Sequence, residues 1–308
     1  MTGQAPIVTV GVPVYRGTAF VAETLASILA QRDVRFAVRI CVDGGDEFSA
    51  AACAPFLRDP RVSLEVSPSR LGWVKNTAAV LEAACKTGAA YAVIHPQDDL
   101  MKPFYLATLL SVAESEGSVV TFSDIQAFGE REALLHQDSV RGSPFERQMA
   151  LLTGHYNAVA FRGLTRTDAL RSLPGIAGNS VGDFAADTVW MARLARAGEL
   201  RRVPEVLYLK RYHGANTHTA WARWPVEMKL AAWAQHCVDM FCEALHVAES
   251  RDQRSRLYAA AVARLLHTGT PVGPYHGELA SLSKAGRRGL RLRFETRLLK
   301  RRLAGGRS

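Results

Sequence analysis

Several features that would point to other classes of protein are missing from this 308-residue sequence. No uncharged apolar run approaches the ~18 residues that a membrane-spanning helix requires. The five cysteines form no C-x-x-C pair, which indicates free thiols in a reducing cytoplasm. No basic residue precedes the first apolar stretch, so we expect no signal peptide. No G-x-G-x-x-G follows the first predicted strand, which excludes a dinucleotide-binding dehydrogenase.

What is present is ordinary globular composition with one biased segment. Apolar residues make up 48% of the chain and charged residues 22%, which argues against disorder. The net charge of +9 lies in the last 28 residues, from Ser281 onward, which hold ten basic residues and one acid, Glu295. Residues 1–280 therefore carry no net charge. The high isoelectric point describes a tail and does not by itself indicate a nucleic-acid binder.

The first half of the sequence alternates short β-rich runs with segments of helical periodicity. This order predicts an α/β fold with a mostly parallel sheet flanked by helices. Ligands of such sheets bind beyond the carboxyl ends of the strands, so the segments that follow each strand are the first places to examine. The predicted strands are 7–13, 38–43, 62–66, 91–95 and 119–122, and the predicted helices are 18–31, 48–57, 73–87 and 103–116, the last with Pro103 in its first turn.

The second half is predicted to be mainly helical. Residues 123–143 read as a polar loop, and Ser143 and Glu146 form a capping-box pattern before a helix to about residue 152. Further predicted elements are a helix at 183–197, strands at 200–203 and 206–212, and a helical hairpin at 223–267. We expect a catalytic domain at 1–220, a C-terminal helical appendage at 221–280 and a basic tail at 281–308.

Six short motifs occur in a fixed order, most of them at predicted strand ends. They read GVPVYRG at 11–17, VDGG at 42–45, SRLGWVKN at 69–76, HPQDDL at 95–100, ADTVWMARLARAG at 186–198 and PEVLYLKRYHG at 204–214. No single motif is decisive, but the ordered set resembles the inverting nucleotide-sugar glycosyltransferases of family 2. The resemblance covers roughly residues 6–216 and implies a GT-A fold.

The first three motifs offer candidate donor-binding residues. Asp43 could accept a hydrogen bond from a base N–H, and the glycines after it permit close backbone approach; a capping Asp in a turn is the alternative. The resemblance implies that Pro13 and Tyr15 lie beside the base, although a plain strand-ending turn would also explain them. Lys75, where the family usually has Arg, could face the diphosphate or be a solvated helix residue.

Adjacent acids follow the fourth predicted strand. Asp98 and Asp99 would repel each other unless a cation or donors offset the charge, and a divalent ion bridging carboxylate and diphosphate supplies that offset. The resemblance makes Asp98 the ligand of Mn²⁺ or Mg²⁺, but Pro96 replaces the first Asp of the family's metal motif. His95 or Gln97 could compensate. A helix N-cap pair is the alternative.

An inverting transfer also needs a base that deprotonates the acceptor hydroxyl. The resemblance places this base at Asp187, with Ala186 in place of the family's Glu, and Asp183 one turn earlier is the fallback. Either carboxylate could instead favour a helix N-terminus. The resemblance further implies that Arg211 and His213 face the diphosphate, with His213 completing the metal shell.

The reading that combines these residues is transfer of a sugar from a nucleoside diphosphate, most simply UDP, to a hydroxyl of a surface glycan or its lipid-linked precursor. A sugar-phosphate nucleotidyltransferase is the runner-up, but the first motif lacks its glycine-rich loop. A non-catalytic nucleotide-sugar or glycan-binding module also stays open, because the metal motif is altered.

The tail allows a helix over 287–303 with two apolar sides. Leu290, Phe294 and Leu298 share one side, and the remaining leucines of the segment fall opposite. The tail either binds an anionic membrane surface or is solvated, and its single aromatic residue argues against nucleic acid. We expect a cytoplasmic protein, peripheral at the inner membrane face if the tail binds lipid.

Overall fold

A computed structural model describes residues 6–154, 158–268 and 275–305. The chain divides into two compact units. The first comprises Met1–Ser139, Asn157–Ala177 and Ala197–Gly214, and the second comprises Val140–Tyr156, Gly178–Arg196 and Ala215–Ser308.

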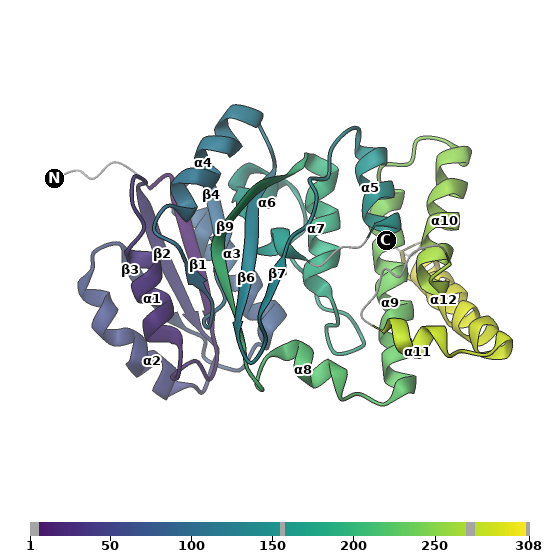
Figure 1. The fold of residues 1–308 in the computed structure, drawn as a ribbon, viewed down its shortest axis with the longest axis horizontal. Coiled ribbons are helices and arrows are strands. Elements are labelled where there is room, and N and C mark those ends of the chain that lie inside the picture. The colour runs from purple at the N-terminus through teal and green to yellow at the C-terminus, as the bar shows by residue number, and fades with distance from the viewer. Residues whose placement is uncertain (1–5, 155–157, 269–274, 306–308) are drawn as a thin grey trace. The chain divides into compact units, whose positions relative to one another are not determined.

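The first unit is built on a nine-stranded sheet (Figure 1). Its strand order is β3-β2-β1-β4-β8-β6-β9-β5, with β7 paired to β6. Strands β1 to β4 pair in parallel, as do β6 and β9, whereas β8, β5 and β7 run antiparallel to their neighbours. The strands are β1 (Val8–Val14), β2 (Phe36–Val42), β3 (Val62–Val66), β4 (Tyr91–Ile94), β5 (Leu100–Met101), β6 (Val120–Gly129), β7 (Ala133–Leu135), β8 (Leu164–Arg166) and β9 (Leu200–Tyr212).

Strand β1 lies inside this sheet, and its sequence explains why. Valines occupy every second position of the strand and all are fully buried, as expected for a strand covered on both faces. Gly11 lets helix α3 (Trp73–Lys86) approach closely, because a Cβ atom built on Gly11 would lie 2.1 Å from Val80 Cγ1. The predicted mostly parallel α/β fold is therefore confirmed.

Helices cover the sheet of the first unit, and most lie where the periodicity predicts them (Figure 1). One boundary was wrong: Pro103 lies two residues before α4 rather than in its first turn, and Phe104 is the N-cap. The helices are α1 (Val21–Leu29), α2 (Glu47–Cys53), α3 (Trp73–Lys86), α4 (Tyr105–Glu116) and α6 (Thr167–Ser172).

Two predictions for the middle of the chain were wrong in physically informative ways. The segment expected to be a polar loop, 123–143, begins inside strand β6, which continues to Gly129. Ile125 and Ala127 are buried there, and the polar residues Asp124 and Gln126 alternate with them. The two strands predicted at 200–203 and 206–212 form one strand, β9. An irregularity in its pairing with β6, between Ser123 and Ile125, absorbs the interrupting Pro204 and Glu205.

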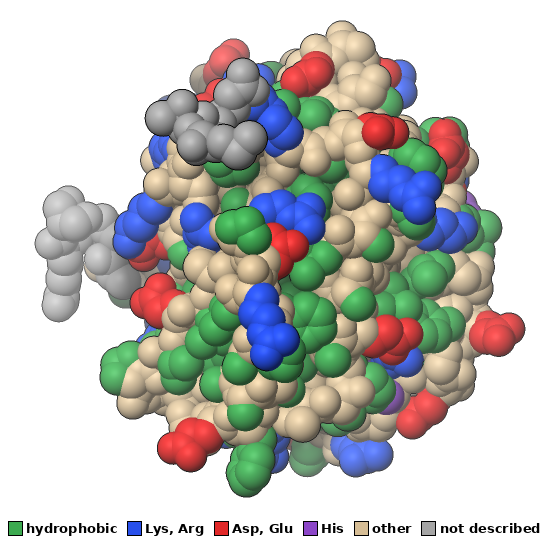
Figure 2. Space-filling view, turned by 90° about the vertical axis from the view of Figure 1, so that its left-hand side faces the viewer, with side chains coloured by type: hydrophobic (Ala, Val, Ile, Leu, Met, Phe, Trp, Pro, Cys, Tyr) green, Lys and Arg blue, Asp and Glu red, His purple; other side chains and the backbone are tan. Residues whose placement is uncertain are grey.

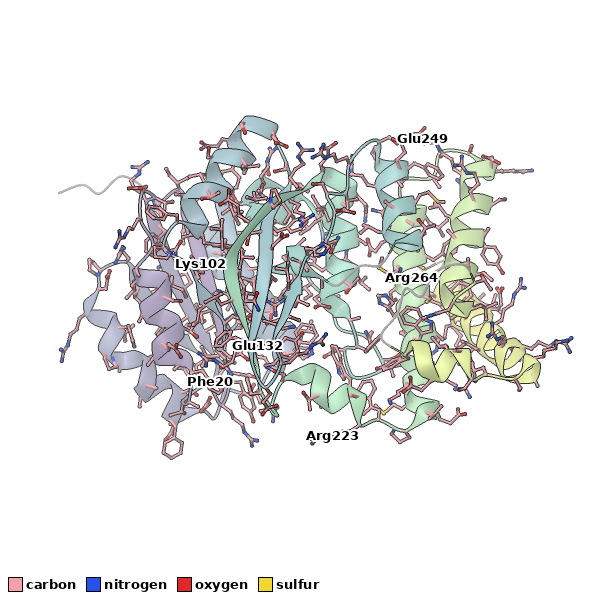
Figure 3. The ribbon with its side chains drawn as sticks, viewed as in Figure 1. Phe20, Lys102, Glu132, Arg223, Glu249 and Arg264 are labelled. Atoms are coloured by element: carbon pink, nitrogen blue, oxygen red, sulfur yellow. The ribbon has the colours of Figure 1, made fainter. Side chains whose placement is uncertain are left out.

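The second unit is helical. The predicted capping box at Ser143 and Glu146 is present, and Arg264, labelled in Figure 3, donates hydrogen bonds from Nη1 to the carbonyl groups of Leu151, Leu152 and Gly154. The helical hairpin predicted at 223–267 is confirmed as α9 and α10. The helices are α5 (Pro144–Thr153), α7 (Ala186–Ala197), α8 (Thr217–Ala222), α9 (Val226–Leu245), α10 (Arg251–Leu266), α11 (His276–Ala280) and α12 (Lys284–Gly305).

The basic tail folds as part of this unit. Helix α12 packs against α9 and α10, and it buries Leu290, Phe294 and Leu298 almost completely. The helix predicted at 287–303 is thus confirmed, with the three apolar residues of its first face directed inward. Among the described residues, no helix is long and apolar enough to cross a membrane.

Candidate active site

Asp43 lies directly after β2 and is almost fully buried. Its carboxylate accepts hydrogen bonds from the backbone N–H groups of Leu71 at 2.5 Å, Gly72 at 2.9 Å and Gly44 at 3.0 Å. Asp43 therefore fixes the loop between β3 and α3 against the end of β2. A carboxylate offers about four acceptor positions, so these three bonds leave one for the base contact that the sequence predicts.

Tyr15 follows β1 and is held by a side chain from the end of β4. The Gln97 amide pairs with the Tyr15 backbone, accepting from its N–H and donating to its carbonyl, both at 2.7 Å. The guanidinium carbon of Arg70 lies 4.1 Å from the centre of the Tyr15 ring, a cation–π contact. Pro13 precedes this turn and is half-buried.

Neither Arg70 nor this role of Gln97 was predicted. Arg70 is the second residue of the SRLG motif, so its position in that motif was the available signal. Lys75, by contrast, was predicted to face the diphosphate. It is exposed in the first turn of α3, and its contact with a donor stays a prediction.

Asp98 and His213 meet at the ends of β4 and β9. The His213 Nε2 atom lies 2.8 Å from Asp98 Oδ2, and both side chains keep about a fifth of their surface exposed. Burial, and next the charge of Asp99, raise the pKa of the Asp98 carboxyl, while His213 opposes this shift. The predicted pair of metal ligands is therefore together, and no group of three or more His, Cys, Asp or Glu side chains suited to a metal occurs in the described parts of the chain.

Asp99 has a different place from its neighbour. It is buried, and it accepts hydrogen bonds from Arg162 Nε at 2.9 Å, Tyr208 Oη at 3.0 Å and the Arg211 backbone N–H at 2.9 Å. The repulsion expected between the adjacent acids is thus offset at Asp99 by protein donors. Asp99 fixes β9 beside the Asp98 loop and orients the segment that carries His213.

Arg211 lies between two aromatic rings. Its guanidinium carbon is 4.8 Å from the ring centre of Phe20, labelled in Figure 3, and 4.5 Å from that of Phe128. Its Nε donates to the Asp98 carbonyl at 3.0 Å and its Nη2 to Glu23 at 2.5 Å. The cation is therefore held rigidly at the same strand ends as Asp98, which suits the predicted contact with a diphosphate.

The candidate base Asp187 belongs to the second unit. It lies half-buried in the first turn of α7 and accepts from the Thr188 N–H at 2.8 Å. The segment before it is strained, because Gly182, Asp183 and Ala185 have φ angles of 59°, 55° and 52°. Such backbone is costly for residues other than glycine and is common at functional sites.

The fallback base Asp183 has a local partner in this strained segment. Its Oδ1 accepts from the Asn179 N–H at 2.9 Å, and Asn179 in turn donates to the carbonyl of Phe184. This bracing supports the left-handed backbone at Asp183. Asp187 therefore stays the predicted base, and Asp183 stays its fallback.

The model of glycosyl transferase family 2 matches residues 9–173, more than half of the chain. The chain belongs to glycosyl transferase family 2. Glycosyltransferase function is thereby established for this chain, and the strand ends that carry Asp43 and Asp98 lie inside the matched region. No curated protein matches the chain.

Solved structures support the GT-A fold of this glycosyltransferase. S. aureus TarS 1–349 in complex with UDP-GlcNAc has a TM-score of 0.64 and 13% identity, over 85% of this chain and 73% of that one. The mannosyltransferase PcManGT from Pyrobaculum calidifontis, in complex with GDP-Man and Mn²⁺, has a TM-score of 0.53 and 19% identity, over 96% of this chain and 88% of that one. At such identities the likeness shows the fold alone.

Proposed function

We propose that this glycosyltransferase moves a sugar from a UDP-sugar to a hydroxyl of a surface glycan or its lipid-linked precursor, with inversion. The observation that carries the proposal is the Asp98–His213 pair beside Arg211 at the strand ends of the first unit. Family 2 membership and the donor complexes of TarS and PcManGT support a nucleotide-sugar donor. Because PcManGT binds GDP-Man, the test includes guanosine donors.

The residues fit a divalent cation. A carboxylate and an imidazole 2.8 Å apart are ligand types that Mn²⁺ accepts, and such ions commonly take only one or two protein ligands besides substrate phosphates. Asp98 and His213 would hold the ion, which when bound neutralises charge that develops on the leaving diphosphate. Arg211, fixed between two rings, and Lys75 place further positive charge for the same phosphates.

The residues at the ends of β1 and β2 bind the nucleotide base in this proposal. Tyr15, stiffened by Gln97 and Arg70, and Pro13 form an apolar and aromatic surface suited to a base. The remaining acceptor capacity of Asp43 suits the single imide N–H of uracil. This chemistry favours UDP as the donor nucleotide.

Asp187 is the proposed base. Inversion requires a group that takes the acceptor proton as the hydroxyl oxygen attacks the anomeric carbon. The bond to the leaving diphosphate breaks as the new glycosidic bond forms, and the proton passes to the Asp187 carboxylate. A lipid-linked acceptor would make the enzyme a cytoplasmic one that works at the inner face of a membrane, in polysaccharide synthesis.

The experiment measures release of nucleoside diphosphate from UDP-glucose, UDP-galactose, UDP-GlcNAc and GDP-mannose, with Mn²⁺, with Mg²⁺ and with chelator. We expect turnover of a UDP-sugar with Mn²⁺ and a rise in melting temperature with UDP and Mn²⁺. Asp187→Asn should keep the thermal shift and lose turnover by roughly 10²–10⁴-fold.

Two results would contradict this proposal. A thermal shift without turnover of any donor would indicate a binding module, and release of pyrophosphate from a nucleoside triphosphate would indicate a nucleotidyltransferase. Undiminished turnover in Asp187→Asn would leave the donor assignment standing but remove the base. Asp183→Asn would then test the fallback.

A further inference from the structure

Helix α12 has a second apolar face, which no described residue of its own unit covers. Leu292, Leu299 and Leu303 are 67%, 57% and 64% exposed. At about 100° per residue, spacings of seven and four place the three side chains within about 40° of one another. They lie opposite the buried stripe of Leu290, Phe294 and Leu298, so the helix is apolar on two opposite sides.

Cations border the exposed leucines on both sides. Lys284, Arg288 and Arg291 follow one edge of the stripe, Arg293 and Lys300 follow the other, and all five are exposed. Arg293 pairs with Glu227, and Arg291 lies 3.8 Å from Glu295. Among the described residues, Lys284, Arg288 and Lys300 form no ion pair. We call this surface, Leu292, Leu299, Leu303 and the five cations, the outer face of α12.

We propose that the outer face of α12 binds the surface of an anionic lipid bilayer. Leucines at the centre can enter the boundary between headgroups and acyl chains. Long basic side chains at the margins can extend to lipid phosphates while their stems cover apolar surface. The structure thus gives the tail a defined orientation, with one apolar stripe for the protein and one for the membrane.

The same features disfavour other occupants. Nucleic acid would pair with the cations but would leave three leucines against a polar phosphate backbone. A second copy of the chain would bring two strongly basic helices together, since residues 284–305 hold nine basic residues and one acid, and like charges repel. An anionic bilayer satisfies both the leucines and the cations.

The charge is local to this helix. Residues 1–280 carry no net charge, and the face formed by the α2 and β3 side of the first unit shows basic and acidic side chains interspersed (Figure 2). We therefore expect the attraction to lipid to act through α12. This binding goes beyond sugar transfer and is measured without any nucleotide sugar, so failure of the proposed function leaves its test unaffected.

The test is co-sedimentation of the full chain with vesicles of phosphatidylcholine alone and of phosphatidylcholine mixed with phosphatidylglycerol. We expect binding to the anionic vesicles at least about tenfold stronger, weakening as NaCl is raised. The triple variant Leu292→Ser, Leu299→Ser, Leu303→Ser and the double variant Arg288→Glu, Lys300→Glu should each lose about tenfold or more in affinity.

Matched controls change exposed side chains of the same types in the first unit. The control for the leucine variant is the triple variant Phe48→Ser, Leu57→Ser, Leu134→Ser, and the control for the charge variant is the double variant Arg58→Glu, Lys102→Glu. Both controls should bind anionic vesicles like the parent chain. All variants should keep the melting temperature of the parent chain. Equal binding to both vesicle types, or unchanged binding by both α12 variants, would overturn the proposal. So would tighter binding to duplex DNA or RNA that the leucine variant retains, or a dimer that the leucine variant abolishes.

Discussion

The Nε2 atom of His213 lies 2.8 Å from Oδ2 of Asp98, although the two residues are 115 positions apart in the sequence. The contact joins the end of β9 to the loop after β4. Where family members place an additional Asp before this position, the chain has Pro96, which offers no ligand. A metal ion bound here would therefore have Asp98 and His213 as its protein ligands.

Replacing Asp98 by Asn should cost about 100-fold in kcat/KM at fixed Mn²⁺, because an amide is a much weaker ligand than a carboxylate. His213→Gln should cost about 10-fold, mainly as a raised Mn²⁺ requirement. Mn²⁺ titrations of initial rates measure both effects. Asp138→Asn, which changes a 96% exposed carboxylate of the same unit, is the control. A Mn²⁺ requirement unaltered by Asp98→Asn would remove this residue from the metal site.

A glycine beside Asp43 gives a second prediction. A Cβ atom on Gly44 would lie 2.3 Å from the Ser69 carbonyl carbon and 2.6 Å from Ser69 Cα. Gly44→Ala must therefore displace the loop whose amides bind Asp43. We expect about a tenfold rise in the donor KM with a loss of about 1–3 kcal/mol in stability. Initial rates and denaturant unfolding measure the two effects.

The neighbouring Gly45 is the control for that prediction. Its φ is 78° and a Cβ atom there would meet nothing within 4 Å. Gly45→Ala should cost about 1 kcal/mol through backbone strain and leave the donor KM within about twofold. If both variants raised the donor KM equally, displacement of the Ser69 loop would not be the cause.

Periodicity predicted most of the first unit because its sheet strands are buried on both faces and its helices on one, which leaves a strong pattern in residues such as Val8, Val10 and Val12. It missed β6 beyond residue 122, where polar residues such as Ser123, Asp124 and Gln126 interrupt the pattern. The buried Asp124 carboxylate has its partner on β9, 78 positions away, where Arg202 Nε donates to it at 2.7 Å. Such long-range compensation is invisible in a local window.

The buried side chain of Asp99 gives a third prediction. Asp99→Asn would leave the guanidinium of Arg162, 14% exposed, without its carboxylate, and uncompensated buried charge costs about 3–5 kcal/mol. Chemical denaturation at neutral pH measures the loss. The control, Asp168→Asn, breaks the solvent-exposed pair with Arg166 and should cost at most about 1 kcal/mol. Equal losses would show that burial does not govern the Asp99 pair.

The candidate site was predicted unevenly for a similar reason. Asp98 and His213 were expected at one metal site from their motifs, and they do meet. The sequence could not show that the Asp43 carboxylate accepts hydrogen bonds from three backbone amides, nor that Gln97 pairs with the Tyr15 backbone, because both interactions depend on loop conformation. Arg70 was overlooked because a single arginine in a loop is indistinguishable from a solvated one until the Tyr15 ring is placed beneath it.

The last prediction concerns His95, which is fully buried and donates to or accepts from the Tyr208 hydroxyl at 2.9 Å through Nδ1. Its Nε2 has no hydrogen-bond partner among the residues that the structure describes. Burial, the largest cause, lowers the pKa of His95 from 6.5 to about 4. Between these two values the unfolded chain binds the proton and the folded chain does not, so stability must fall as the pH is lowered from 6.5 toward 4.

His95→Asn removes this titration and can retain the bond to Tyr208. By pH 5 the parent chain should therefore have lost about 2 kcal/mol more than the variant, relative to their values at pH 7. Urea unfolding at pH 7, 6 and 5 measures the difference, and His136→Asn, at an exposed histidine, is the control. If the free energy of unfolding fell equally with pH in the parent chain and in His95→Asn, His95 would be protonated within the folded chain. Its Nε2 would then reach a hydrogen-bond partner or water.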